Sequence, residues 1–585
     1  MGLPKPPKEV QMFLRREHLA ALVVAVSLAA STQLAYAQVD MWQLNGVPLC
    51  AAVASQGQPR IVTDGAGGAI VTWQDHRNGT DIGTYAQHVL ASGAVDPAWP
   101  ADGAALSTAA GGYQSVQNIA TDGAGGAIVT WEDDFSLGEY NVYAQRVNAA
   151  GVVQWTPDGV AICTAVGSQV GPTIVTDGAG GAIITWDDNR SGAYATYAQR
   201  VNAAGVAQWT PDGVAISTGQ GSRSMTDGAG GAIVTYAKTS SSGTGVYAQH
   251  VLASGAMDPA WPAGGRGLCT VPGQGGGSIV TDAAGGAIVA WQDGRNFGHP
   301  NFGDPDTYAQ RVNAAGVVQW NADGVLLSAA PSYPGQLSVV PDGAGGAIVS
   351  WTDERSGIDI YAQRVNAAGV VQWTPDGVAV CTAVGGQGFP EISPDGAGGA
   401  IITWDDRRLS GNYDIYAHHV LASGAVDPAW PIDGHALGTG VGDQREPEIV
   451  ADGARGAIVT WQDGRNGSVN TDIYAQRVSG YSISAVATGE PMYSFAVRAP
   501  HPNPANSQAT ISFDLASPQP VSVRVYDVTG RLVRTLVAGG ELPAGSHSLM
   551  WSGASDSGTL AHAGIYFIRV SAGSAAQTRR VAIIR

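Results

Sequence analysis

One stretch of sequence is written eight times in this chain, and a repeat of this length constrains the architecture more strongly than any local pattern. Successive copies are 50 to 60 residues apart. Each copy opens on a DGAGG-like pentapeptide, which starts at Asp64, Asp122, Asp177, Asp227, Asp282, Asp342, Asp395 and Asp452. An apolar β-branched run, a polar loop of variable length, an alternating YAQRVN-like segment and a TPDG-type turn follow. The pattern contains no helical periodicity, so each copy is predicted to form four or five short strands, one of them a VVQW-like segment.

The two ends of the repeat array predict a closed ring. Each four-stranded unit has apolar faces that only its neighbours can bury, and such units repeated around an axis form a β-propeller. The YAQ segment occurs eight times, but the VVQWTPDGVAIC-like segment follows it only seven times. The missing copy is MWQLNGVPLC, residues 41–50. We therefore predict an all-β, eight-bladed propeller whose N-terminal strand completes the last blade. Two smaller propellers or an open solenoid are the alternatives.

The chain divides into four predicted segments: a secretory signal peptide (1–37), the propeller (38–480), a linker (481–495) and a C-terminal β-sandwich (496–585). In the first segment, Arg15 and Arg16 precede the apolar run 19–30, and an A-x-A cleavage site ends at Ala37. This run is short for a membrane span, and no later apolar stretch reaches about 18 residues. We therefore expect an exported protein without a transmembrane segment.

The C-terminal segment alternates strands with Gly- and Pro-rich turns, which predicts a small β-sandwich. It resembles the type A C-terminal sorting domain of the bacterial type IX secretion system, which is similar to the immunoglobulin-like domain of flagellar hook-capping proteins. The resemblance rests on the PNP, YDVTGR, GIYFIRV and terminal RRV motifs, with Pro502, Asn503, Pro504, Tyr526, Asp527, Gly530, Arg531, Gly564, Tyr566, Arg579 and Arg580. It implies an outer-membrane secretion translocon as partner, delivery to the medium or cell surface of a Gram-negative-type bacterium, and no catalytic activity. A plain accessory sandwich is the alternative.

Charge is divided unevenly along the chain. The leader carries a net charge of +2 and residues 491–585 carry +4, so residues 38–490 hold −24 within the chain total of −18. An acidic ring of this kind repels phosphate backbones, so nucleic acid is not expected as a partner. The acidic surface is interpreted as solvated, with a Ca²⁺-loaded face as the alternative. No other cofactor is expected.

The four cysteines, Cys50, Cys163, Cys269 and Cys381, occupy the same position in every second repeat. Equivalent positions two blades apart lie far beyond the Cα separation of about 7 Å that a disulfide allows. Although export would favour bridges, the register predicts free, buried thiols that act as small apolar residues. A four-cysteine metal site on the axis is the alternative.

Residues that recur in every copy are predicted to be structural, because an active site needs its acid–base pair once and not once per blade. The Asp of DGAGG is expected to bond amides of its own turn. The tryptophan nine positions later is expected in the core between blades: Trp73, Trp131, Trp186, Trp291, Trp351, Trp404 and Trp461. The acid eleven positions later is expected to form an ion pair or a backbone bond: Asp75, Asp188, Asp293, Asp353, Asp406 and Asp463, with an Arg two residues beyond in all six.

Function is expected where the copies differ, in the loops after the repeated acid, which lie together on one face. The longest is 294–307, with Phe297, His299, Phe302, Asp304 and Asp306 as predicted binding residues. Aromatic rings beside carboxylates suit a sugar or Ca²⁺, although an ordinary surface loop is the simpler interpretation. No catalytic or metal-binding residue is predicted.

Three functions follow from these features. The first is a non-enzymatic surface or secreted protein that binds an extracellular glycan or protein through its variable-loop face. The second is a polysaccharide hydrolase or lyase, which would need two convergent carboxylates, one with a raised pKa. Asp304, Asp306, Glu139 and Asp134 are the non-repeated acids to inspect. The third is an architectural component of a surface layer.

Overall fold

A computed structural model of the protein describes residues 41–79, 81–109, 114–136, 138–241, 243–275, 277–295, 305–330, 336–408, 411–467, 470–480, 496–497, 500, 503, 505, 508–515, 519–542, 545–573 and 575–584. These residues form strands and turns, and no helix occurs among them. The chain separates into two compact units, residues 1–483 and 484–585. The predicted signal peptide and linker lie outside the described residues. Within the described part of the chain, no helix is long and apolar enough to cross a membrane.

The described residues of the N-terminal unit form eight antiparallel four-stranded sheets, here numbered 1 to 8 along the chain. Sheet 1 consists of β2 (Gln56–Thr63), β3 (Ala69–Asn78), β4 (Asp81–Val89) and β5 (Ala104–Ser107). Sheet 2 consists of β6 (Gln114–Thr121), β7 (Ala127–Ser136), β8 (Glu139–Val147) and β9 (Val160–Cys163). Sheet 3 consists of β10 (Gln169–Thr176), β11 (Ala182–Asp188), β12 (Ala195–Val201) and β13 (Val214–Ser217). Sheet 4 consists of β14 (Gln220–Thr226), β15 (Ala232–Ser240), β16 (Gly243–Val251) and β17 (Arg266–Cys269).

The second half of the unit repeats this order. Sheet 5 consists of β18 (Ser278–Thr281), β19 (Ala287–Asp293), β20 (Asp306–Val312) and β21 (Val325–Ser328). Sheet 6 consists of β22 (Leu337–Pro341), β23 (Ala347–Asp353), β24 (Asp359–Val365) and β25 (Val378–Cys381). Sheet 7 consists of β26 (Gln387–Pro394), β27 (Ala400–Asp406), β28 (Asp414–Val420) and β29 (His435–Gly438). Sheet 8 consists of β30 (Gln444–Ala451), β31 (Ala457–Asp463), β32 (Asp472–Val478) and β1 (Val47–Cys50).

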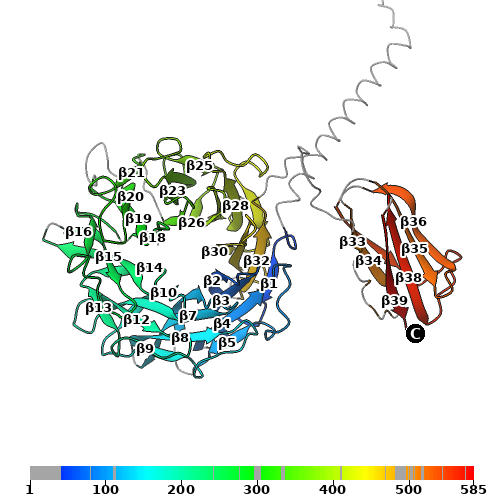
Figure 1. The fold of residues 1–585 in the computed structure, drawn as a ribbon, viewed down its shortest axis with the longest axis horizontal. Helices are drawn as coiled ribbons and strands as arrows, with labels where there is room; N and C mark the ends of the chain where they lie inside the picture. Colours follow the sequence, from blue (N-terminus) through cyan, green and yellow to red (C-terminus); the bar gives the residue numbers. More distant parts are fainter. Residues whose placement is uncertain are drawn as a thin grey trace, which may run out of the picture. The chain divides into compact units, whose positions relative to one another are not determined.

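The sheets follow one another around a common centre (Figure 1). The first strand of each sheet lies beside the first strand of the next, and β30 of sheet 8 lies beside β2 of sheet 1. The prediction that residues 41–50 complete the last sheet is confirmed, because β1 pairs with β32. The prediction that the VVQW-like segment forms a strand is wrong. This segment forms only an isolated bridge, such as Val147 with Val153, because the turn before it leaves room for one residue pair.

The core of this unit lies between neighbouring sheets. The repeated tryptophans have no exposed surface, and Tyr236 takes their place in sheet 4. The buried cluster between sheets 8 and 1 joins Leu49 and Ile458 to Val71 and Trp73, like the clusters at the other junctions. The second strand of each sheet is apolar on both faces because it is covered on both sides. A sheet therefore has no core of its own and is stable only with its neighbours.

The C-terminal unit contains two antiparallel sheets, which enclose one apolar core with Phe513 and Trp551 at its centre. The first sheet consists of β33 (Ala496–Val497), β34 (Ala509–Leu515) and β37 (Gly545–Trp551). The second consists of β36 (Leu532–Leu542), β35 (Gln519–Asp527), β38 (Gly564–Ala572) and β39 (Ala575–Ile583). Buried and exposed residues alternate along β38, as expected for a strand with one face on the core.

Candidate functional site

The predicted loop site lies mostly outside the described residues. Phe297, His299, Phe302 and Asp304 belong to the segment 296–304, which the structure does not describe. Asp306 is described: it is buried, and its backbone pairs with Asp293 where β19 and β20 join. Of the other acids, Asp134 follows the repeated Asp133, and Glu139 Oε2 accepts the N–H of Gly167 at 3.2 Å. A binding role for the loop therefore stays a prediction.

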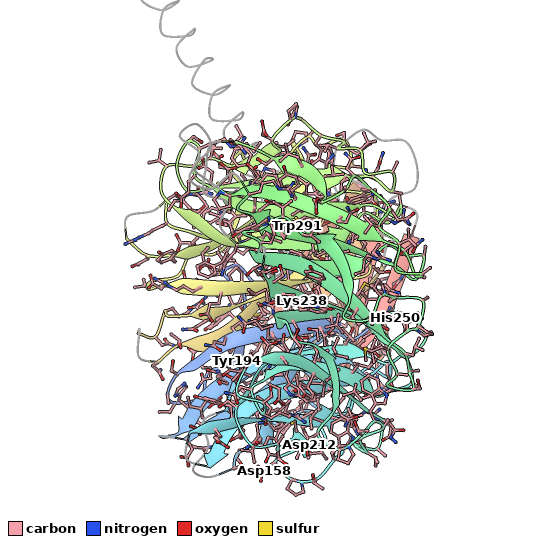
Figure 2. All side chains as sticks on the ribbon, turned by 90° about the vertical axis from the view of Figure 1, so that its left-hand side faces the viewer. Asp158, Tyr194, Asp212, Lys238, His250 and Trp291 are labelled. Atoms are coloured by element: carbon pink, nitrogen blue, oxygen red, sulfur yellow. The ribbon has the colours of Figure 1, made fainter. Side chains whose placement is uncertain are left out.

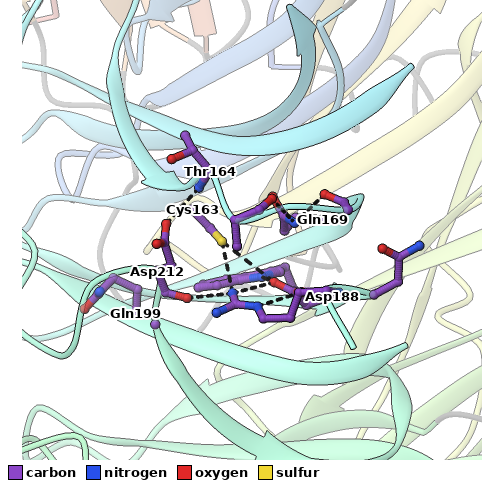
Figure 3. A network of polar contacts seen from close by, with 12 residues as sticks. Cys163, Thr164, Gln169, Asp188, Gln199 and Asp212 are labelled. Atoms are coloured by element: carbon purple, nitrogen blue, oxygen red, sulfur yellow. Dashed lines mark hydrogen bonds and ion pairs between the residues drawn. The ribbon is translucent and has the colours of Figure 1, made fainter. Parts of the chain in front are cut away.

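The repeated tryptophan, aspartate and arginine form one buried network (Figure 3). In sheet 3, Asp188 Oδ2 accepts the indole N–H of Trp186 at 2.9 Å and a guanidinium N–H of Arg190 at 2.6 Å. Asp188 Oδ1 accepts the backbone and Nε hydrogens of Arg190, both at 2.9 Å. Arg190 also donates to the carbonyl oxygen of Asp212 at 2.8 Å. The same ion pair occurs at Asp75, Asp293, Asp353, Asp406 and Asp463. Both oxygens of Asp188 are thus engaged within the network, which is consistent with the predicted structural role of these residues at the sheet edge.

The cysteines enter this network from the neighbouring sheet. All four are free and buried, as predicted. They are not purely apolar, however: Cys163 Sγ of sheet 2 accepts a guanidinium hydrogen of Arg190 at 3.1 Å, and Cys50 Sγ of sheet 8 accepts one from Arg77 at 3.2 Å. The register argument placed the thiols correctly but missed this polar contact, because it compared equivalent positions and not successive sheets. Where the structure describes the chain, no cluster of His, Cys, Asp or Glu side chains could hold a metal ion.

The thiols should be inert in the folded protein. Burial raises the pKa of Cys50, Cys163 and Cys381 to about 12 and that of Cys269 to about 11, and the thiolate is the reactive form. We expect no reaction with a chromogenic disulfide reagent at pH 8 in buffer, and four equivalents per chain in denaturant. Reaction of the native protein, or disulfides found by mass spectrometry, would contradict the buried free-thiol assignment.

The Asp of each DGAGG turn has two partners. One oxygen accepts amide hydrogens of its own turn, as predicted: Asp122 Oδ1 accepts those of Ala124 and Gly126, both at 2.8 Å. The other oxygen pairs with the residue after YAQ, which the sequence analysis did not foresee. That residue is Arg146 in sheet 2, and it also donates to the carbonyl oxygen of Ala203 in sheet 3 at 3.0 Å. The pair therefore also links neighbouring sheets.

Sheets 1, 4 and 7 use histidine at this position, each between two carboxylates. In sheet 7, His419 contacts Asp427 at 2.9 Å through Nδ1 and Asp395 at 3.0 Å through Nε2. Burial disfavours the charged imidazole, but the two carboxylates outweigh burial and raise the pKa of His419. The sequence carried a signal for this arrangement, because YAQH or YAHH is always followed by a DPAW segment that contains the second Asp.

A cavity of about 1040 Å³ lies among the first strands of the sheets, at the centre of the ring. One position, four residues before the DGAGG Asp, contributes to the cavity lining from six of the eight sheets. Around the ring the eight residues at this position are Arg60, Asn118, Thr173, Arg223, Ser278, Ser338, Glu391 and Glu448. Six of them line the cavity; Asn118 and Thr173 do not. The residue that follows this position is Ile in six copies, and neither flanking position carries a charge in any copy, whereas this position carries a charge in four; the symmetry of the repeat is therefore broken here by charge.

Charged residues in the cavity come from sheets 1, 4, 7 and 8. Arg60 Nη1 donates to Glu448 Oε1 at 2.8 Å, which joins sheet 1 to sheet 8. Ser338 Oγ donates to Glu391 Oε2 at 2.9 Å, which joins sheet 6 to sheet 7. Burial in the cavity, followed by the charge of Glu448, raises the pKa of Glu391. Arg223 is exposed in the cavity and donates only to the carbonyl oxygen of Ser222 among the hydrogen bonds found there.

A β-bulge directs further side chains into the cavity. The bulged residue, six before the DGAGG Asp, has a positive φ. It is glycine in sheets 3 and 4 (Gly171 at 61° and Gly221 at 70°), but Gln58 (51°), Phe389 (53°) and Glu446 (56°) in sheets 1, 7 and 8. A bulky residue in this conformation costs about 1–3 kcal/mol, and such strain is concentrated at functional sites. Phe389 keeps 51% of its surface exposed, so the strain is not offset by core burial.

The cavity is lined mainly by the inner strands and not by the variable loops. Its lining residues lie from the start to the middle of these strands, as Gln58 and Arg60 do in β2, or just before them, as Gln336 does before β22. Sequence analysis missed it because inner-strand residues were treated as scaffold. A signal was present: at one position, residues as different as Arg, Thr and Glu alternate within otherwise similar PTIV-like segments.

The motif residues of the C-terminal unit have structural contacts. Asn503 is fixed to β39, because its Nδ2 donates to the carbonyl oxygen of Arg580 and its Oδ1 accepts the N–H of Ala582, both at 2.9 Å. Asp527 closes the YDVTGR turn by accepting the N–H of Arg531 at 3.0 Å, with Gly530 at φ 81°.

The remaining motif residues include both buried and exposed side chains. Tyr526 pairs with Phe567 across the sheet, and Gly564 begins β38. Tyr566 is buried and donates to the carbonyl oxygen of His562 at 2.9 Å. Arg579 contacts Gln577, and Arg580 is exposed. Pro502 and Pro504 lie outside the described residues.

Comparison with known proteins gives a domain assignment for the C-terminal unit only. Residues 502–576 match the model of the FlgD Ig-like domain family. No curated protein matches the chain. Among solved structures, the chain is similar to a protein of unknown function from Dyadobacter fermentans, with 10% identity, a TM-score of 0.38, and coverage of 64% of this chain and 97% of that one.

Two further solved structures have similarly low scores. An ulvan lyase of polysaccharide lyase family PL25 has 11% identity and a TM-score of 0.36 over 60% of this chain and 90% of that one. PorZ, an essential bacterial surface component of the type-IX secretion system of Porphyromonas gingivalis, has 10% identity and a TM-score of 0.20 over 92% of this chain and all of that one. The family match over residues 502–576 supports the predicted Ig-like fold of the C-terminal unit.

Proposed function

We propose that the protein is an exported, non-enzymatic binding protein, whose eight sheets form a closed eight-bladed β-propeller that takes an extracellular ligand into its central cavity. The observation that carries the proposal is the break in symmetry. The Trp–Asp–Arg network recurs in six of the eight sheets and the DGAGG pair in all eight, whereas the cavity position changes between Arg, Asn, Thr, Ser and Glu. Selection for stability alone gives no reason to place charges of both signs at this position in four copies, when the residues on either side of it are uncharged in all eight.

Three features support a glycan or a peptide as the ligand class. Phe389 offers an exposed aromatic face, which suits a sugar ring or an apolar side chain. Gln58, Gln336 and Ser338 offer neutral hydrogen-bonding groups in the same cavity. The volume of about 1040 Å³ is that of a small-ligand site. The net charge of −24 over residues 38–490 disfavours nucleic acid.

The C-terminal Ig-like domain is proposed to act as the sorting signal. Its basic end, with Arg579 and the exposed Arg580, matches the motif on which the resemblance to type IX sorting domains rests. On this proposal a secretion translocon of the outer membrane recognises the domain, and the ring is delivered to the cell surface or the medium. Ca²⁺ stays a possible addition at the loop 294–307.

A screen of the mature protein on glycan and peptide arrays, with and without Ca²⁺, tests the binding function. We expect a ligand on one of the arrays whose affinity falls at least tenfold in the Phe389→Gly variant, because the aromatic face is removed. Glycine fits the positive φ, as Gly171 and Gly221 do, so this variant should be at least as stable as the wild type. Ile432→Ala, which removes an exposed apolar residue outside the cavity, is the matched control.

Each result of the screen decides the site. A hit that survives Phe389→Gly but is lost when the loop 294–307 is shortened would move the site to the predicted loop. A blank on both arrays would overturn the binding proposal in favour of a surface-layer component.

A second function, polysaccharide hydrolysis or lysis, is favoured by one observation: Glu391 and Glu448 are neighbours in the cavity, and the pKa of Glu391 is raised. A protonated and an ionised carboxylate side by side are the pair that glycoside cleavage requires. Release of reducing or unsaturated ends from a bound oligosaccharide, abolished by Glu391→Gln, would assign this function instead.

A further inference from the structure

The cavity has charges of opposite sign on opposite walls. In the order of the ring, sheet 4 and sheet 8 are separated by three sheets in either direction, and sheet 7 is next to sheet 8. Arg223 comes from sheet 4, whereas Glu391, Glu446 and Glu448 come from sheets 7 and 8. Arg60 neutralises Glu448 through their ion pair, so one guanidinium on one side and two carboxyl groups on the other are left for a ligand.

Two of these groups have no charged partner among the described residues. For Arg223, no ion pair is found among the described residues, although its charge acts at longer range on the buried Asp187. Glu446 has one buried carboxylate oxygen, Oε2, without a hydrogen-bond partner. A buried carboxylate oxygen without a donor is costly, which points to a group that the bound state supplies.

We propose that the cavity takes a short peptide with free ends, whose carboxylate pairs with Arg223 and whose ammonium group lies between Glu391 and Glu446. This inference rests on the binding function proposed above and specifies its ligand. Arg offers a planar fork of donors that fits a carboxylate, and an ammonium group has three donors for the carboxyl oxygens opposite. Phe389, two residues before Glu391 on the same strand, offers its exposed ring to a peptide side chain.

Other classes of ligand would pair with the charged groups of only one wall, or of neither. A divalent cation would engage the glutamates and leave Arg223 unpaired, and a phosphate or a uronate would do the reverse. A neutral oligosaccharide would leave both walls unpaired. A zwitterion engages both walls, and in an extended peptide the separation between its two charged ends grows by about 3.3–3.6 Å per residue.

Binding should also be linked to pH. The groups that act on Glu391 are Glu448, Ser338 and Arg60, with Glu446 on the neighbouring strand. Because burial raises its pKa, Glu391 is protonated over part of the neutral range, and an ammonium ligand must displace that proton. The affinity for the peptide should therefore rise with pH below about 8 and fall above it, where the α-ammonium group of the peptide loses its own proton, and the rise should disappear in Glu391→Gln.

Calorimetric titration of the full mature chain with Gly-Phe-Gly, its N-acetylated form and its C-terminal amide tests the proposal. We expect the free peptide to bind at least tenfold tighter than either capped form. In Arg223→Gln the free peptide and the amide should bind equally. In Glu446→Gln the preference for the free over the acetylated peptide should shrink, and in the double variant Glu391→Gln/Glu446→Gln the two should bind equally. Arg524→Gln removes an exposed arginine of the other unit and should change none of these ratios.

The capped peptides separate this inference from the binding function. If the doubly capped peptide or a neutral oligosaccharide binds as tightly as the free peptide, with the Phe389→Gly loss retained, the zwitterion assignment is wrong and the binding function stands. If neither peptides nor glycans bind, both are wrong. Unchanged melting temperatures of the two charge variants exclude misfolding as the cause of a loss.

Discussion

A chain that lacks residues 41–50 should lose at least ~5 kcal/mol of stability, because these residues supply the last strand of sheet 8 and half of its junction with sheet 1. Leu49 and Cys50 are buried at that junction, and Trp461 packs against Gly46. Met41 N–H bonds to the carbonyl oxygen of Arg477 at 2.8 Å. The deletion leaves the apolar edge of β32 and the side of Trp73 in water. The urea midpoint of the truncated protein is the measurement.

The junction between sheets 8 and 1 repeats the contacts of the other junctions, which is why the loss should be global. Arg477 donates to the carbonyl oxygen of Ala91 at 3.0 Å, as Arg146 does to Ala203. The N–H of Ala51 bonds to Asp102 Oδ1 at 3.0 Å, as Thr164 does to Asp212 (Figure 2 labels the turns of Asp158 and Asp212). These equivalences support a closed ring.

Hydrogen exchange and a peptide of residues 41–50 added in trans provide the control. In a closed ring, exchange should accelerate in β32 and in the facing β2, and the added peptide should restore the midpoint, whereas a scrambled peptide should not. An unchanged midpoint with unchanged protection of β32 would contradict the closure.

The sequence predicted the features that repetition imposes. Repetition of the tryptophan identified the core, and the count of TPDG segments identified the split sheet, because both are properties of every copy. The cavity could not be found in this way. Arg60 and Glu448 are distant in sequence, and they meet only because sheet 8 returns to sheet 1. Phe389 enters the cavity through a bulge at a residue that no turn motif marks.

The second omission concerned pairs between copies. Comparing aligned positions shows what each sheet shares with the others but not which residues of successive sheets touch. Cys163 meets Arg190 because an outer strand lies over the edge of the next sheet, and this crossing is a property of packing and not of the repeat. For the same reason, the link from Arg146 to Ala203 could not be read from the sequence.

Asp188→Asn and Asp133→Asn should have opposite effects on stability, although they are the same substitution at the same position of successive sheets. Asp188 holds Arg190 and Trp186, so its loss leaves a guanidinium and an indole N–H with weaker partners, at a cost of about 2–3 kcal/mol at pH 7. In sheet 2 the arginine is absent from the sequence, because Phe135 stands at its position. Asp133 is fully buried, and neither of its oxygens has a partner in hydrogen-bond geometry, although Trp131 and Gln114 lie near enough to offset burial in part.

The pH dependence distinguishes the two variants. Burial raises the pKa of Asp133 to about 6, so the wild-type protein binds its proton more tightly when folded. Proton binding therefore adds to the free energy of unfolding below the unfolded pKa of about 4. This added stability, roughly 3 kcal/mol, is lost as the pH rises to about 6. Asp133→Asn should remove this loss and raise the urea midpoint at pH 7 but not at pH 4.

In sheet 3 the pKa of Asp188 is lowered, because its bonds to Arg190 outweigh the effect of burial. The loss of stability caused by Asp188→Asn should therefore become smaller as the pH falls below 4. Equal midpoint changes for the two variants at pH 7 would show that the arginine does not determine the role of the buried carboxylate, and the network would then be no more than a packing motif.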